Sequence, residues 1–254
     1  MNKIEQGFAD TTALLFGTRL EHLHDYSAWL QQDLVATILS FKSAITGSDV
    51  HVPQVDFFKP MKDNLVTANE ALEFGKKSLT DTQVYSLNLS NASTMLKDIR
   101  ITCCDWVFGE IIDVKKCVAY GPLQYGYKNA FCWWNKMIAY SCIIRTSEYL
   151  FGCSHVTDSS FCIKCYDSIK LNRCFEVSAS QSCNACYFCH NCENLDDCMF
   201  CFNLRGKKYA IANIEIGKGN YLKVKQIIMK NIADELEKSK KLRFTIFNLS
   251  SSIS

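Results

Sequence analysis

Cysteine recurs along this chain at regular intervals, and that regularity limits the possible folds more than any other feature of the sequence. Five cysteines stand nine residues apart, namely Cys165, Cys174, Cys183, Cys192 and Cys201. Other pairs are separated by 18 or 21 residues, and all of these steps are multiples of three. A fixed internal period is typical of repeat proteins, in which each repeat packs on its neighbours.

Coils of 18 to 21 residues, as these steps suggest, suit a parallel β-solenoid in which equivalent residues of successive coils stack in ladders. Neighbouring coil walls lie only about 4.8 Å apart, so small apolar side chains are favoured inside. Reduced cysteine behaves as such a side chain. Aromatic residues such as Phe175, Phe188 and Phe200 would fill the wider parts. We therefore expect the cysteines to form the core of a solenoid.

The residue pattern divides the chain into three regions. Residues 1–80 are predicted to be helical, with apolar residues between 20 and 41 spaced as on one helical face and a second helix over 64–79. Residues 81–216 form the cysteine-rich domain, with short strands expected at 83–87, 99–103 and 143–146. Residues 217–254 hold an amphipathic helix to about residue 240 and then a weak strand pattern over 242–249.

These regions together predict an α+β protein with N-terminal helices, a cysteine-rich parallel β-solenoid and a C-terminal amphipathic capping helix. A solenoid needs caps because its terminal coils present unpaired strand edges. The residues expected on the apolar face of the C-terminal helix are Tyr221, Val224, Ile228, Ile232 and Leu236.

The cysteines are expected to be reduced. Their number, 15, is odd, which rules out complete internal disulfide pairing. The first residues are polar and resemble no secretory signal. The longest mostly apolar stretch, residues 34–45, contains Lys42 and is too short to span a bilayer. These features favour the cytoplasm, or the inside of a viral particle, and argue against a membrane partner.

Metal binding is the main alternative role for the thiols. Cys183, Cys186, Cys198 and Cys201 form two C-x-x-C pairs, and two such pairs can hold a tetrahedral zinc ion. Zinc is the leading cofactor. The three-residue steps of Cys183, Cys186, Cys189 and Cys192 also resemble the start of an iron–sulfur ligand run, but, unlike in bacterial ferredoxins, no proline lies near them. Cysteines also recur outside the pairs, as at Cys132, which the packing interpretation explains and the zinc interpretation does not. Both interpretations hold together if a zinc ion joins the last coils.

The most specific segment is residues 197–213, which read D-C-M-F-C-F-N-L-R-G-K-K-Y-A-I-A-N. This segment and the helix after it resemble mostly uncharacterised cysteine-rich repeat proteins of archaea, candidate-phylum bacteria and their viruses. Those proteins repeat an N-C-x-x-C element and end in N-L-x-x-K-x-Y-x-I-x-N. The resemblance, over about residues 150–240, implies a repeat structure and no particular reaction. Many of those proteins have cysteine where this chain has Ala210, which argues against a metal role for the last turn.

No familiar catalytic arrangement is present. The G-x-S-x-G, P-loop and H-E-x-x-H motifs are missing from the sequence. Cys189 and His190 are adjacent, so on a strand they would point to opposite faces and would not act as a nucleophile and its base. We therefore expect a protein that is not an enzyme.

Nucleic-acid binding is a separate class of function. The aromatic and basic residues that could stack on bases are Tyr125, Tyr127, Lys128, Trp133 and Trp134. The formal net charge of +2 gives little long-range attraction for nucleic acid. The sequence thus favours a structural or scaffold protein that assembles with itself or with other subunits. A zinc-binding nucleic-acid- or ribosome-binding module is the alternative, and a redox sensor is a third hypothesis.

Overall fold

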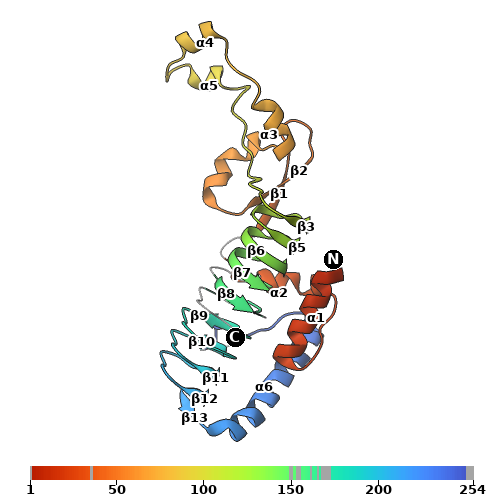
Figure 1. The fold of residues 1–254 in the computed structure, drawn as a ribbon, viewed down its shortest axis with the longest axis vertical. Helices are drawn as coiled ribbons and strands as arrows, with labels where there is room; N and C mark the ends of the chain where they lie inside the picture. The colour runs from red at the N-terminus through yellow and green to blue at the C-terminus, as the bar shows by residue number, and fades with distance from the viewer. Residues whose placement is uncertain are drawn as a thin grey trace.

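The computed structural model describes residues 2–34, 37–148, 151–152, 156–160, 162–164, 166 and 173–249. Its main feature is a stack of parallel strands that forms a β-solenoid (Figure 1). Each strand residue pairs with the residue 12 positions further along, as Ile111 does with Leu123 and Tyr187 with Met199. The predicted fold class is confirmed, but the coil has 12 residues rather than 18 to 21.

Each coil is built from steps of three residues. The first residue points outward, the second has a positive φ, and the third points into the coil. In the step Tyr187-Phe188-Cys189, Phe188 has a φ of 52° and Cys189 is completely buried. Positive φ values recur at multiples of this step from Asp113 to Ala212. Four such corners close one coil, which explains why the inward cysteines are separated by multiples of three, whereas Cys104 and Cys142 lie off this register in another cluster.

The solenoid strands run in chain order along the molecule (Figure 1). They are β3 (Ile111–Lys115), β4 (Val118–Tyr120), β5 (Leu123–Tyr127), β6 (Ala130–Ala139), β7 (Cys142–Glu148), β8 (Val156–Ser160), β9 (Phe175–Ser178), β10 (Tyr187–His190), β11 (Asp196–Met199), β12 (Lys208–Ile211) and β13 (Ile214–Glu215). The strand predicted at 143–146 lies in β7. The pairing is parallel from β3 to β12, and β13 then turns back antiparallel on β12.

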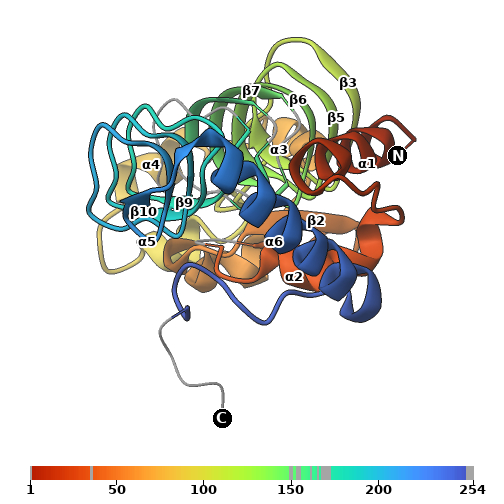
Figure 2. The same ribbon diagram turned by 90° about the horizontal axis from the view of Figure 1, so that it is seen from below.

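Two helices, α1 (Asn2–Phe16) and α6 (Gly217–Ser239), lie along one side of the solenoid (Figures 1 and 2). Helix α6 begins at the last coil and runs back beside α1. Tyr221, Ile232 and Leu236, predicted to lie on its apolar face, are buried. The helices cover a ladder of outward residues formed by Ala139, Phe151, Ile163, Phe175, Tyr187 and Met199.

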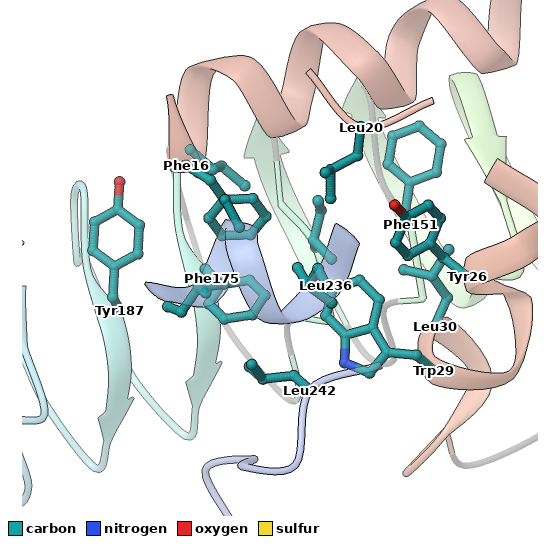
Figure 3. Packing of buried hydrophobic residues seen from close by; sticks show 14 of the residues in the cluster. Phe16, Leu20, Tyr26, Trp29, Leu30, Phe151, Phe175, Tyr187, Leu236 and Leu242 are labelled. Carbon is teal, nitrogen blue, oxygen red and sulfur yellow. The ribbon is translucent and has the colours of Figure 1, made fainter. Parts of the chain in front are cut away.

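Aromatic contacts fix this side of the molecule (Figure 3). The ring of Phe16 in α1 lies edge-on to Phe175, with ring centroids 5.1 Å apart. The short helices η1 (Leu23–Tyr26) and α2 (Ser27–Gln31) pack beside it. Gly152, with a φ of 81°, lies so close to the end of α2 that a Cβ there would stand 2.2 Å from the Leu30 carbonyl oxygen. The solenoid backbone and α2 are therefore in direct contact.

The N-terminal third differs from the prediction. The helix predicted over residues 20–41 is wrong, because β1 (Ile38–Lys42) pairs antiparallel with β2 (Asp49–Pro53). Ile38 and Phe41 instead pack with the buried Val50 and Val52 in an apolar cluster beside the first coils. The apolar residues between 20 and 41 are spaced as in a helix, but pairing of β1 with β2 determines the structure of the second half of this segment. Helix α1 precedes this region, and inside it the Thr11 hydroxyl donates a hydrogen bond to the Gly7 carbonyl.

Shorter helices replace several other predicted elements. The helix predicted at 64–79 is reduced to α3 (Ala68–Phe74), which follows η2 (Asp56–Asn64), and the strand predicted at 83–87 is helix α4 (Asp81–Ser86). Thr80 and Gln83 exchange side-chain and backbone hydrogen bonds that fix the start of α4. Helix α5 (Ala92–Met95) follows. Residues 242–249 form turns rather than the predicted strand.

Candidate functional site: the thiol core and the two ends of the solenoid

The four predicted zinc ligands lie together inside the last coils. Cys183, Cys186, Cys198 and Cys201 all point inward and are buried. Cys189 and Cys192 lie in the same core, so the sequence pairs identify only part of the thiol cluster. All cysteines in the described part of the chain are free thiols. Cys153 and Cys165 lie outside the described residues.

The buried thiols donate hydrogen bonds to the inner carbonyl groups of the coils. The Cys192 Sγ lies 3.3 Å from the His190 oxygen and 3.3 Å from the Cys201 oxygen nine residues on. The amide of Asn129 makes the equivalent bond, from its Nδ2 to the Ile138 oxygen at 3.0 Å. Cysteine therefore fits this core as a small side chain that is also a weak donor.

Contacts among the thiols shift their acidity in opposite directions. Hydrogen bonds with Cys183, Cys189 and Cys198, together with burial, raise the pKa of Cys186. A hydrogen bond from Cys189 lowers the pKa of Cys192 to about 7. Within the cluster, loss of a proton is therefore easier at Cys192 than at Cys186. Among the described residues, no three Cys, His, Asp or Glu side chains are arranged to hold a metal ion.

A buried ion cluster lies under the helices, and sequence reasoning missed it. Lys164 and Glu176 occupy equivalent corners one coil apart and are fully buried, with Nζ and Oε1 3.5 Å apart. The Lys164 Nζ is also 3.5 Å from Asp33 Oδ2. The other Glu176 oxygen accepts the Ile246 N–H at 2.7 Å. Burial raises the pKa of Glu176 to about 7 despite the attraction of Lys164. The cluster joins the N-terminal segment, the solenoid and the C-terminal turns.

The first coil leaves the core open. Ile111 is an inward residue of β3, yet it is 39% exposed, whereas Leu123 one coil further on is 0% exposed. Ile112 in the same strand is also exposed. Trp106, which precedes β3, is 67% exposed, and Phe108 is exposed as well. We call these four residues with exposed side chains (Trp106, Phe108, Ile111 and Ile112) the open end.

The last coil, by contrast, is closed by polar groups. The side chain of Asn213 bonds both the N–H and the carbonyl of Phe202, each at 2.9 Å, and so takes the place of a further strand. The Glu215 carboxylate accepts the Lys208 N–H at 3.1 Å and lies 3.4 Å from the Lys207 Nζ. The two ends of the solenoid therefore differ in chemical character.

An arm extends beyond the open end (Figure 1). It consists of residues 81–95 and carries helices α4 and α5. Tyr85 and Leu89 are 90% and 98% exposed, and Val84 is also exposed. Such a group of exposed apolar side chains makes the arm a candidate contact surface.

The aromatic and basic group predicted as a nucleic-acid surface is divided by the fold. Tyr127 packs beside His24 and Tyr140 on the side of the helices. Trp133 follows Tyr127 by six residues, which is half of a 12-residue coil, so it lies on the opposite side. Lys128 stays with Tyr140, while Trp134 is exposed beyond Trp133. These residues do not form one surface.

No protein-family model and no curated protein matches this chain. None of the described helices combines the length and apolar character needed to cross a membrane.

Proposed function

We propose that this protein is a non-enzymatic structural subunit that assembles with copies of itself. The observation that carries the proposal is the open end, where inward residues of the solenoid remain exposed while the other end is capped. A terminal coil without a polar cap is a surface for association. The exposed arm lies at the same end, which supports the same conclusion.

The interior of the solenoid supports a scaffold role. Its inward side chains pack against one another in a continuous cluster from Cys117 to Ala210, which gives a rod with a filled core. Such a rod can hold binding surfaces at fixed positions along an assembly. The buried free thiols suit a reducing compartment, so we place the assembly in the cytoplasm or within a viral particle.

Analytical ultracentrifugation of the full chain over a wide range of concentrations tests this function. We expect a concentration-dependent oligomer, since apolar association follows mass action. A strict monomer at every concentration would contradict self-assembly.

A zinc-binding nucleic-acid- or ribosome-binding module is the second candidate. It is supported by the burial of Cys183, Cys186, Cys198 and Cys201 in one core cluster, where a zinc ion would have to draw the four thiols closer together than they lie here. Elemental analysis separates the two candidates. Stoichiometric zinc, lost in Cys198→Ser but kept in the matched variant Cys132→Ser, would favour the zinc module. A chain without zinc, whose circular dichroism is unchanged by chelator, would favour the plain scaffold.

A further inference from the structure

We propose that two copies of this chain join end to end through strand β3, in antiparallel pairing about a two-fold axis. This inference rests on the proposed self-assembly and specifies its contact surface. The pairing would extend the sheet across the junction from one copy into the other.

Strand β3 has one edge on which a further strand can pair. This strand pairs with β5 on one edge, and no strand within the described ranges pairs with its other edge. An unpaired, exposed strand edge carries main-chain groups that only another strand can satisfy in register. At the far end of the solenoid, β13 and the Asn213 side chain already occupy the corresponding edge. Strand β13 also has an outer edge but contains only two residues, so β3, with five residues, is the longer of the two terminal strands.

Part of the apolar core is exposed at the same edge. Ile111 and Val114 are inward residues, and Ile111 remains 39% exposed because no coil covers it. A second copy placed edge to edge would bring its own Ile111 and Val114 over them. The apolar core would then continue through the junction, and burial of this surface would favour association.

The charges at the two ends of β3 differ in sign. Glu110 precedes β3, while Lys115 and Lys116 end and follow it, and all three are exposed; Lys115 also forms an ion pair with Asp113 of the same strand at 3.0 Å. In an antiparallel pair, the start of one strand lies beside the end of the other. Glu110 of each copy then faces the two lysines of the other, so that opposite charges meet twice in one symmetric interface. Parallel pairing of the same strands would place like charges together.

Symmetry limits the assembly to a closed dimer through this contact. The same surface is used by both copies, so the contact is complete after two chains have joined. Because the other end is capped, the dimer does not grow into a filament by stacking of coils. The β1–β2 hairpin, α3 and the arm all project past this end of the solenoid and would lie beside the second copy (Figure 1).

A charge-exchange experiment tests the inference by sedimentation equilibrium of the full chain. Glu110→Lys alone, and Lys115→Glu with Lys116→Glu, should each weaken dimerisation about tenfold or more, because both place like charges across the junction twice. Combining all three changes should restore dimerisation. Lys136→Glu, the same charge change on another coil, is the matched control and should leave the dimer unchanged.

The outcomes separate this inference from the proposed function. If the wild type assembles but the Glu110 and lysine variants assemble equally well, the contact lies elsewhere, and self-assembly stands without β3. If Glu110→Lys and the double lysine variant each weaken the dimer but the variant with all three changes does not restore it, the antiparallel arrangement is wrong. A wild-type chain that stays monomeric overturns both proposals. Circular dichroism of each variant checks that the solenoid remains folded.

Discussion

At the scale of single residues, the buried Lys164–Glu176 pair is the least expected feature of the molecule. Charged groups are rarely buried without partners, and here Asp33 and the Ile246 N–H complete the cluster. The pair holds together three segments that are distant in sequence. It also makes the stability of the fold depend on pH.

Between its ordinary value of 4.5 and about 7, folded Glu176 retains a proton that the unfolded chain has released. Stability should therefore fall as pH rises through this window, by on the order of 3 kcal/mol for this group. Glu176→Gln keeps an acceptor for Ile246 and removes the titration. Urea unfolding at several pH values should show that the wild type loses stability relative to this variant from pH 4.5 to 7. Glu193→Gln removes an exposed carboxylate and is the control, so it should lose stability over this pH range as the wild type does. If Glu176→Gln loses as much stability as Glu193→Gln, the prediction is wrong.

The cysteines show how far single residues can be predicted. Their burial and their place in the core follow from spacing alone, because every inward position is a multiple of three from the next. The coil length cannot be derived in the same way. The cysteine steps of nine, 18 and 21 residues are all multiples of three, but none of them equals the coil length of 12 residues. The burial of Lys164 and Glu176 could not be predicted either, because a charged residue at a corner is normally solvated.

At the scale of elements, the corners of the coils set an unusual requirement on the backbone. Residues with side chains occupy the left-handed region at step after step, including the β-branched Ile143 at a φ of 56°. This conformation costs about 1–2 kcal/mol for a residue with a Cβ. The stacked hydrogen bonds between coils and the filled core must offset that cost at every corner.

Because corner residues adopt a positive φ, replacing alanine by glycine should have opposite effects on stability at a coil corner and in a helix. Ala185 is a half-buried corner residue with a φ of 50°, so Ala185→Gly should relieve strain and stabilise the chain by up to about 1 kcal/mol. Ala13 is also half-buried but lies in α1, where the same change should cost about 1 kcal/mol. Thermal unfolding of both variants measures the difference. Destabilisation of similar size at both sites would show that the corners carry little strain.

Elements differ in how well the sequence predicts them, for a physical reason. Helix α6 was predictable because its apolar face repeats over about four turns, from Tyr221 to Leu236, and packs on a regular ladder. The hairpin of β1 and β2 was not, because its two strands depend on each other and on the first coils rather than on local spacing. The short arm helices depend on capping side chains such as Thr80, which a search for apolar periodicity does not detect.

At the scale of the whole molecule, the solenoid has a direction. Coils stack from an open end toward a capped end, while α1 and α6 protect one side over much of that length (Figure 2). The closed end and the covered side contribute to folding of the single chain. The open end and the arm beyond it contribute little to that folding, because their apolar side chains contact mainly solvent.

This division predicts that stability and assembly can be changed separately. Tyr85→Ser with Leu89→Ser removes the two most exposed apolar side chains of the arm, so the monomer should unfold at nearly the same temperature. The same variant should associate more weakly, since these side chains would be buried against another copy. Leu236→Ser in α6 is the contrasting change, because it places a hydroxyl in the covered core and should destabilise the chain by several kcal/mol. Thermal unfolding and sedimentation should be measured for both variants and for the wild type. If the arm variant associates as strongly as the wild type, the arm is not part of the assembly surface.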